Sequence, residues 1–417
     1  MATTTINQPI ITLRQAIGYA LTNGSSLQLA QEKVQEQKGV QYSALGPLLP
    51  TVTTNTGPEI QQNLLPSSAP AGTKLQTGLS VAVPLMDVGN TLQLQAKRVG
   101  LQQAVASVTT QKSELIYKTA LAYVDAVLAV RVARLTKLQL ASFQKQHSSV
   151  KRRLQEGLAH QADLQRAQLD ILTSHSKLLR AQNEQQQKLL QLAAIMQHNK
   201  PFAVVQQLQL PAWEFAKQPP QQLVQQAMAQ RVKVKDRQLA IKMAKREHAA
   251  AWWDLFPSLQ ATTGVAHTAP LVGGDLQEAL TWRAGATLLW SPYKGGTRYG
   301  NMRQTRSRIG QQRLQLQALT WEIWQHTHQQ HHRLMTLQQR VHMAQQAFST
   351  SQQLHRSTVD LYDNGQATVL ELSAAERDLA NAEIELAQVR SDLQRAQLDL
   401  AYTVGLLQQH NIAAKLL

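Results

Sequence analysis

Hydrophobic residues recur every three or four positions over most of the chain, which is the spacing of one face of an α-helix. The C-terminal stretch shows this best, because Leu372, Leu379 and Leu386 begin a series of leucines at every seventh residue. Ala, Val or Thr stands three positions after most of these leucines, and this pattern predicts close coiled-coil packing. The predicted helices cover residues 12–46, 90–156, 160–198, 219–255, 297–362 and 367–407.

Two short segments alternate apolar and polar residues instead, which is typical of β-strands. They are "KLQTGLSVAV" at 74–83 and "TWRAGATLLW" at 281–290. A weaker alternation precedes each of them, at residues 50–61 and 257–268, and supplies a partner strand. The pattern therefore predicts four strands among much longer helices.

The chain repeats itself at an offset of about half its length. Ala20 matches Ala227 at an offset of 207 residues, and Gly157 matches Gly365 at an offset of 208. Each copy has the same order of helix, proline stop, two strands, long helix, glycine and second helix. We interpret this as a tandem duplication, with a first repeat at 1–208, a second at 209–417 and a linker at about 199–218.

The two matched glycines predict turns, because glycine inside a helix costs about 1 kcal/mol relative to alanine. At about 1.5 Å per residue, helix 90–156 is roughly 100 Å long. The shorter helices 12–46 and 160–198 sum to about the same length. We therefore expect two antiparallel helical hairpins side by side, with Gly157 and Gly365 at their tips.

Trp282 and Trp290 lie eight residues apart on one face of their predicted strand. At about 3.3 Å per residue this separation is roughly 26 Å. It is close to the ~25 Å apolar band between the aromatic girdles of an outer-membrane barrel, so we expect the pair to mark the membrane. Two tryptophans that pack in a soluble sheet would give the same pattern.

Composition narrows the function classes. The chain has no cysteine, which excludes disulfides, thiolate metal sites and thiol nucleophiles. The sequence has no run of 18 apolar residues, so we expect no transmembrane helix. The first residues, "MATTTINQPIITLRQA", lack the basic start and apolar core of a secretory signal. We expect the sequence to be a mature one, or to start downstream of the true initiator.

The net charge of +16 could attract nucleic acid or an anionic membrane surface. The basic residues are scattered through glutamine-rich helices, however, and no block of five like charges occurs. We therefore expect no nucleic-acid partner. The second function class that the sequence leaves open is a soluble coiled-coil scaffold or a basic nucleic-acid-associated protein.

The duplicated order of elements resembles that of TolC-type outer-membrane efflux proteins over nearly the whole chain. The most specific segment is "YDNGQATVLELSAAERDLANAEIELAQ", which is similar to the family's second hairpin tip and the following helix. The resemblance implies a mainly α fold with some β-structure, in which long antiparallel coiled-coil hairpins form an α-barrel. It also implies that each protomer gives four strands to a trimeric 12-stranded transmembrane β-barrel.

The function that the resemblance implies is a passive exit duct in the outer membrane, with a helical tunnel through the periplasm. The protein would be a homotrimer and no enzyme, and would need no cofactor. Its partners would be a periplasmic adaptor, an inner-membrane pump of RND, ABC or MFS type, and outer-membrane lipid. Drugs, metals and secreted polypeptides all use such ducts, and the sequence does not distinguish among these cargoes.

The resemblance also implies a gate near the hairpin tips. The positions that match the family's polar links and acidic aperture are Asp163, Tyr362 and Glu371. We expect a Tyr362–Asp163 hydrogen bond between neighbouring hairpins, and a Glu371 ring that favours cations. The chain departs from the family where Ala367 replaces a latch arginine and Ala374 replaces a second acidic ring, which suggests a weaker latch or a different cargo. The alternative for the gate is that Tyr362 only packs and Asp163 only solvates the tip.

One further motif, "HTHQQHHR", places His328 and His332 four residues apart on a predicted helix. This spacing suits a metal site, but no carboxylate joins the histidines. We interpret the segment as a solvated helix face and expect no metal site.

Overall fold

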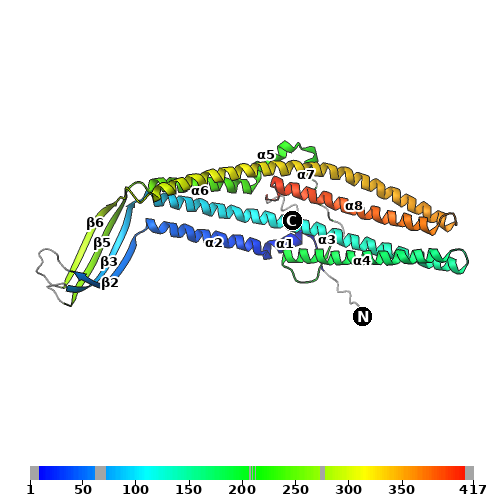
Figure 1. The fold of residues 1–417 in the computed structure, drawn as a ribbon, viewed down its shortest axis with the longest axis horizontal. Coiled ribbons are helices and arrows are strands. Elements are labelled where there is room, and N and C mark those ends of the chain that lie inside the picture. The colour runs from blue at the N-terminus through cyan, green and yellow to red at the C-terminus, as the bar shows by residue number, and fades with distance from the viewer. Residues whose placement is uncertain are drawn as a thin grey trace. The chain divides into compact units, whose positions relative to one another are not determined.

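The computed structural model describes residues 9–61, 72–205, 208, 210–211, 213–272 and 278–408. The strands are β1 (Ile10–Ile11), β2 (Thr51–Gln61), β3 (Gly72–Met86), β4 (Ala203–Val204), β5 (Ser258–Val272) and β6 (Ala279–Leu289). The α-helices are α1 (Leu13–Asn23), α2 (Ser25–Leu45), α3 (Val88–Gln155), α4 (Gln161–Met196), α5 (Pro220–Gln230), α6 (Val232–Trp253), α7 (Thr297–Asp363) and α8 (Val369–Val404) (Figure 1). Short 3-10 helices lie at Gly46–Leu48, Phe215–Lys217 and Leu406–Gln408.

This order confirms the predicted fold class. Two helices, two strands, a long helix and a second long helix occur twice along the chain. Within the described ranges, no helix has the length and apolar character needed to cross a membrane.

The chain forms two compact units, and each takes residues from both repeats. One unit comprises 1–29, 108–232 and 319–417, and we call it the tip unit because it contains both hairpin turns. The other comprises 30–107 and 233–318, and we call it the sheet unit. The boundary between the repeats at residues 208 and 209 stays a prediction.

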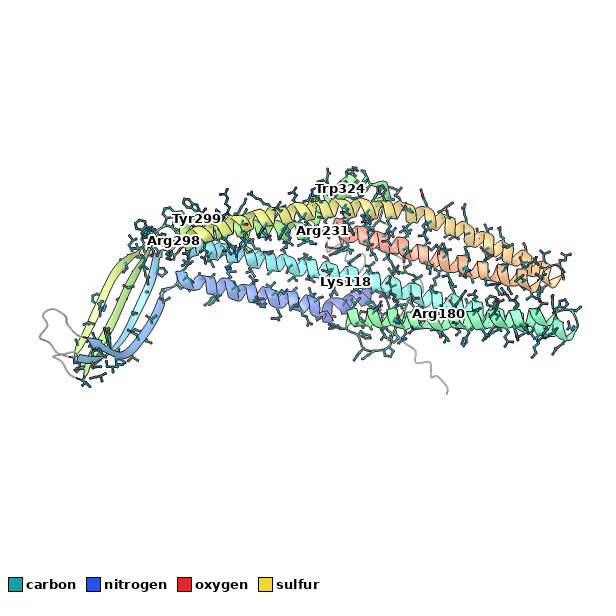
Figure 2. All side chains as sticks on the ribbon, viewed as in Figure 1. Lys118, Arg180, Arg231, Arg298, Tyr299 and Trp324 are labelled. Carbon is teal, nitrogen blue, oxygen red and sulfur yellow. The ribbon has the colours of Figure 1, made fainter. Side chains whose placement is uncertain are left out.

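The first helix of each repeat is two helices, so the single helices predicted at 12–46 and 219–255 are wrong. Gly24 separates α1 from α2 with extended backbone, and Arg231 separates α5 from α6 in the same way. Arg231 is labelled in Figure 2. The two breaks are 207 residues apart, which is the offset of the repeat. At each break the N–H still donates to the carbonyl four positions earlier, from Gly24 to Ala20 and from Arg231 to Ala227.

Packing explains the first break. A Cβ on residue 24 would lie 2.4 Å from the carbonyl oxygen of Ala20 and 2.7 Å from a methyl carbon of Leu115 on α3. Only glycine allows the chain to pass so close to the neighbouring helix. No proline marks either break, so apolar periodicity does not reveal them.

The strands of the sheet unit form one antiparallel sheet in the order β2-β3-β5-β6, which confirms the four predicted strands. The β3–β5 pairing joins the two repeats. Leu79, Val265 and Trp282 are register partners across three strands and therefore share a face. Thr53 and Ser80 lie on the opposite face, where their hydroxyls are 2.7 Å apart. The sheet thus has an apolar face and a polar face.

The core of the tip unit gathers α1, α3, α4 and α8 around a buried tyrosine. The Tyr123 hydroxyl donates to the carbonyl oxygen of Ile11 at 2.7 Å and accepts the N–H of Val205 at 3.3 Å. Strand β1 pairs in parallel with β4, so the same core holds the segment before α1 and the linker after α4. The hydroxyl of this tyrosine therefore holds the two segments together.

The heptad series of α8 is largely buried, as the coiled-coil pattern predicts. The buried members are Leu372, Ala375, Leu386, Val389, Ala396, Leu400, Thr403 and Leu407. Helix α4 differs, because it carries leucines on its exposed surface as well. These residues, which we call the α4 stripe, are Leu169, Leu172, Leu179 and Leu190, and they are 49–60% exposed.

Candidate functional site at the hairpin tips

The two hairpin turns have the same backbone geometry. Gly157 and Gly365 have φ values of +76° and +74°, a left-handed conformation that side chains with a Cβ disfavour. In the first turn, the N–H of Leu158 donates to the carbonyl of Arg153 at 2.8 Å. The N–H of Gln366 makes the equivalent 2.8 Å bond in the second turn, to Leu361. These are Schellman motifs, which satisfy the last carbonyls of α3 and α7.

The helix that follows each turn begins with a carboxylate cap. The N–H of His160 donates to Asp163 Oδ2 at 2.9 Å at the start of α4. The N–H of Thr368 donates to Glu371 Oε2 at 2.7 Å at the start of α8, and the hydroxyl of Thr368 donates to the same oxygen. These bonds hold the pKa of Glu371 below its ordinary value. In the single chain, Asp163 and Glu371, two of the three predicted gate residues, therefore stabilise their own helix starts.

Tyr362 packs inside the contact between the two tips. It is 4% exposed and clusters with Val150 of α3, Ala167 of α4, and Val369 and Leu372 of α8. Its hydroxyl has no hydrogen-bond partner in the described part of the chain. Within one protomer the structure does not bring this hydroxyl to Asp163, so the hydrogen bond between neighbouring hairpins stays a prediction.

Arg153 forms the polar link between the tips. Its guanidinium carbon lies 4.1 Å from the centre of the Tyr362 ring, and its Nη2 donates to the Tyr362 carbonyl oxygen at 3.1 Å. A 4.0 Å approach to Asp363 adds a weak ion pair. Sequence reasoning did not single out this arginine. Its one signal is asymmetry between the repeats, because Leu361 stands at the matching position of the second copy.

Ala367 and Ala374 are the two positions at which a weaker latch is expected. Ala367 packs against the tip cluster around Tyr362. Ala374 is exposed on α8. Neither side chain can form a polar link, so Arg153 and the two caps supply the described polar contacts of the turns.

The two tryptophans of the predicted girdle differ in their surroundings. Trp282 lies in β6 and is 72% exposed on the apolar face of the sheet. Trp290 lies one residue beyond the end of β6, and its indole N–H donates to the carbonyl of Leu255 at 3.2 Å. That bond fixes the orientation of Trp290 where the strand leads back to the helices. The membrane assignment of both side chains stays a prediction.

The histidines of α7 do not converge. His328 packs against Trp324 with ring centres 4.6 Å apart, whereas His332 is exposed. His326 contacts the Thr403 hydroxyl at 3.0 Å. Among the residues that the structure describes, no group of three or more histidine, cysteine, aspartate or glutamate side chains could hold a metal ion.

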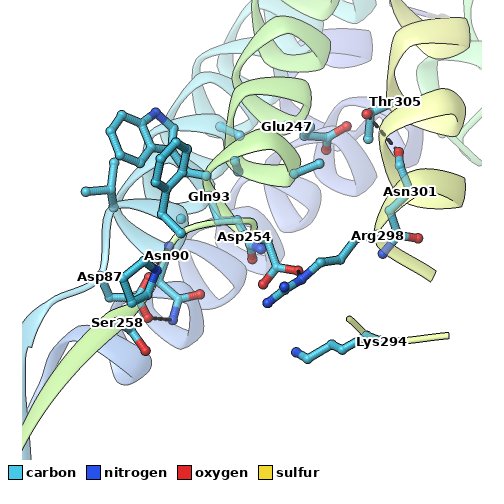
Figure 3. A pocket seen from close by; sticks show the side chains of 18 of the residues that line it. Asp87, Asn90, Gln93, Glu247, Asp254, Ser258, Lys294, Arg298, Asn301 and Thr305 are labelled. Carbon is cyan, nitrogen blue, oxygen red and sulfur yellow. Dashed lines mark hydrogen bonds and ion pairs between the residues drawn. The ribbon is translucent and has the colours of Figure 1, made fainter. Parts of the chain in front are cut away.

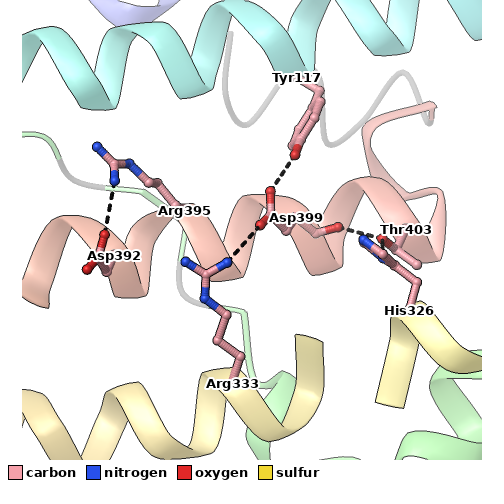
Figure 4. A network of polar contacts seen from close by, with 7 residues as sticks. All are labelled: Tyr117, His326, Arg333, Asp392, Arg395, Asp399 and Thr403. Carbon is pink, nitrogen blue, oxygen red and sulfur yellow. Dashed lines mark hydrogen bonds and ion pairs between the residues drawn. The ribbon is translucent and has the colours of Figure 1, made fainter. Parts of the chain in front are cut away.

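A polar network crosses the tip unit at the level of its core (Figure 4). Asp399 of α8 accepts a short hydrogen bond from the Tyr117 hydroxyl of α3 and lies 3.9 Å from Arg333 of α7. Burial and this carboxylate raise the pKa of Tyr117 well above its ordinary value. The phenol therefore stays protonated and keeps donating, so the network ties α3, α7 and α8 together.

A second group of ion pairs lies one to two turns earlier on α8. Arg395 contacts Asp125 of α3 at 2.6 Å and Asp392 of its own helix at 3.0 Å. Asp125 also lies 3.5 Å from Lys188 of α4. This group joins α8 to the first hairpin.

The sheet unit contains a cavity of about 970 Å³ where β3, β5 and β6 meet the helices (Figure 3). Asp87 caps α3 there by accepting the N–H of Asn90 at 2.8 Å. Arg298 pairs with Asp254 at 3.2 Å and donates to the Ser291 carbonyl. These contacts fix the strand-to-helix turns of both repeats and leave the named charges paired within the cavity wall.

Comparisons with known proteins agree with this architecture. The sequence profile described as "Outer membrane efflux protein" matches residues 16–197 and 223–406. The two matched segments confirm the tandem duplication. A search of curated proteins finds no significant match.

Solved structures share the fold at low sequence identity. One of CusC has a TM-score of 0.82 and 18% identity, and the alignment covers 97% of this chain and 95% of that one. The outer membrane protein VceC of Vibrio cholerae has a TM-score of 0.80 and 16% identity, with 94% and 96% covered. The open state of the MtrE outer membrane channel of Neisseria gonorrhoeae has a TM-score of 0.78 and 20% identity, with 94% and 88% covered.

Family and fold are thus those of channel proteins, and the profile match spans most of both repeats. The chain belongs to the outer membrane efflux protein family.

Proposed function

We propose that this outer-membrane efflux protein is the passive exit duct of a tripartite efflux or type I secretion system. The duct carries substrates from an inner-membrane pump across the periplasm and the outer membrane. The observation that carries the proposal is an amphipathic four-stranded sheet with two open edges in a chain whose other half is paired helical hairpins.

The sheet supports a membrane role because its apolar face has no cover. Val52, Leu79 and Trp282 lie on that face and are 64%, 49% and 72% exposed. Among the strands that the structure describes, β2 and β6 each pair on one side only. A bilayer does not tolerate the unpaired backbone groups of an open edge, so the sheet must close with strands of other copies. Three copies supply the 12 strands of a barrel, with Trp282 and Trp290 at its aromatic girdles.

The α4 stripe supports the same assembly in the helical part. Leu169, Leu172, Leu179 and Leu190 follow heptad spacing, which is the spacing of a coiled-coil seam. The described part of the protomer leaves these leucines about half exposed. A neighbouring copy would bury it, and three protomers then enclose a helical tunnel.

The hairpin tips form the periplasmic gate in this proposal. Arg153 and Tyr362 hold the two tips of one protomer together, and a hydrogen bond between Asp163 and the Tyr362 hydroxyl would form the latch between neighbouring hairpins. Three copies of Glu371 favour cations at the aperture. A periplasmic adaptor docks at the tips, and a pump of RND, ABC or MFS type supplies the energy. The duct itself catalyses no reaction.

Fractionation and conductance test the proposal together. The protein, expressed with a secretory signal, should enter the outer membrane, require detergent for extraction and run as a heat-sensitive trimer. In planar bilayers it should produce discrete conductance steps. Recovery as a detergent-independent monomer in the aqueous fraction would contradict the duct and favour the coiled-coil scaffold.

A further inference from the structure

A cluster of buried polar side chains lies on α3, α4 and α8, a few helical turns away from the hairpin turns. Its members are Gln146 of α3, Asp170 and Ser174 of α4, and Ser373 and Glu376 of α8. We call it the inter-hairpin cluster, because α3 and α4 form one hairpin and α8 belongs to the other. Each side chain is at most 9% exposed. Two carboxyl groups in such a place are costly unless something neutralises one of them.

Several buried polar atoms of the cluster lack a hydrogen-bond partner in the described part of the chain. Gln146 Nε2 donates to the Ser373 hydroxyl at 2.9 Å. Three buried oxygens have no partner in the described part of the chain, namely Gln146 Oε1, Asp170 Oδ2 and Ser174 Oγ. An ionised carboxylate only accepts hydrogen bonds, so two ionised acids would add further acceptors. A proton on one carboxyl supplies a donor and removes a charge.

Glu376 is the acid that keeps the proton. Burial, with a smaller contribution from the charge of Asp170, raises the pKa of Glu376 from its ordinary 4.5 to about 7. The acid pair is not repeated in the other copy, because Gln168 stands at the position that matches Glu376 and Asp378 at the position that matches Asp170. Both matching residues are exposed. The buried acid pair is therefore a feature of the contact between the two hairpins and not of the repeated unit.

The neighbouring charged and titratable groups do not replace the proton. Arg166 lies one turn before Asp170 on α4, and its buried Nε has no hydrogen-bond partner. The Nε of Arg377, next to Glu376, donates to the Ser373 carbonyl at 3.0 Å. On the other two helices, His147 follows Gln146 of α3, and burial lowers the pKa of His355 of α7. In the described part of the chain, no ion pair joins any of these groups to either acid of the cluster.

We propose that Glu376 keeps a proton in the buried inter-hairpin cluster, that this proton clasps the first hairpin to the second, and that its loss loosens the hairpin tips. The folded chain holds the proton more tightly than the unfolded chain does. The clasp is therefore complete below pH 4.5, weakens as the pH rises toward 7, and is absent above the folded pKa. On the proposed function, an alkaline periplasm would favour an open aperture.

Hydrogen exchange of the full-length trimer in detergent tests the clasp. We would compare the wild type with Glu376→Gln, which keeps a neutral hydrogen-bonding side chain at every pH. Asp378→Asn is the matched control, because it removes an exposed acid from the same helix. Comparing proteins at equal pH cancels the intrinsic pH dependence of exchange. The readout is the exchange rate of backbone amides in residues 161–178 and 369–380.

At pH 8.5 the wild type should exchange in these segments at least about tenfold faster than Glu376→Gln. A shift from 4.5 to about 7 sets an upper limit of about 300-fold. At pH 5.0 the two should agree within about twofold, and Asp378→Asn should match the wild type at both pH values. Asp170→Asn should move the midpoint of the pH profile downward, because it removes the neighbouring charge.

Equal exchange of the wild type and Glu376→Gln at pH 8.5 would overturn the clasp. So would faster exchange of Glu376→Gln at pH 5.0, or an Asp378→Asn variant that behaves like Glu376→Gln. The measurement needs the folded trimer but no transport. A negative result would therefore leave the duct standing, whereas failure to insert into membranes would contradict the duct alone.

Discussion

Replacing Arg153 should release the two hairpin tips from each other. The arginine of α3 lies over the Tyr362 ring of α7 at 4.1 Å and donates to its carbonyl oxygen at 3.1 Å. Arg153→Met keeps most of the apolar stem and removes both contacts. Arg152→Met is the matched control, because Arg152 is the adjacent arginine and is exposed.

The structure sets the size of the effect. A partly exposed cation–π contact contributes about 0.5–1 kcal/mol. A hydrogen bond from a charged donor contributes about 1.5–3 kcal/mol when it is shielded, and the Arg153 side chain is 27% exposed. The approach to Asp363 adds little, since that carboxylate is 71% exposed and 4.0 Å away. We expect a loss of about 2–3 kcal/mol, or about 30- to 150-fold in the opening equilibrium of the tips.

Hydrogen exchange of the tip segments and single-channel conductance would both report the change. Arg153→Met should accelerate amide exchange in residues 150–170 and 358–373 by at least about tenfold and raise conductance in planar bilayers. Arg152→Met should leave both close to wild type. Exchange within about twofold of wild type in Arg153→Met would refute the claim that this residue ties the tips together.

Three further predictions concern the hairpin turns. Gly365→Ala forces a Cβ into a left-handed turn and should lower the free energy of unfolding by about 1–2 kcal/mol. Its control, Gly310→Ala, lies inside α7 with no heavy atom within 4 Å of the new Cβ and should raise the free energy of unfolding. Equal melting temperatures of the two variants would contradict this. Because the pKa of Glu371 is lowered in the folded chain, its cap on α8 should be complete above pH 4.5 and be lost as the pH falls through that lowered pKa. Glu371→Gln should flatten the pH dependence of amide exchange at the start of α8. Tyr362→Phe with Asp163→Ala should raise single-channel conductance by breaking the latch between neighbouring hairpins, and unchanged conductance in this double variant would remove the latch. Tyr362→Phe alone should leave stability within about 0.5 kcal/mol, because the lost hydroxyl has no partner in the described chain.

Local signals account for what the sequence predicted well. Helical periodicity, the prolines and the paired glycines placed helix 90–156 within two residues of α3 (Val88–Gln155). Strand alternation placed all four strands of the sheet. The capping pattern at Thr368 and Glu371 is equally local, since the two residues are three apart. The resemblance directed attention to a gate at Glu371, whereas the nearer role of that side chain is to cap α8.

Contacts between distant residues account for what the sequence did not predict. Arg153 and Tyr362 are 209 residues apart, and Gln146 and Ser373 are 227 apart. No periodicity encodes such pairs. The break at Gly24 depends on the close approach of Leu115, which is also remote in sequence. Differences between the repeats, such as Arg153 against Leu361, are the one sequence signal that points to these contacts.

The mass of the protein extracted from outer membranes tests the central claim most directly. That claim is that neither the open sheet nor the exposed α4 stripe is complete in one copy. Native mass spectrometry should give three times the 46.4 kDa of the chain, about 139 kDa. A folded, membrane-extracted particle of 46.4 kDa would contradict the account.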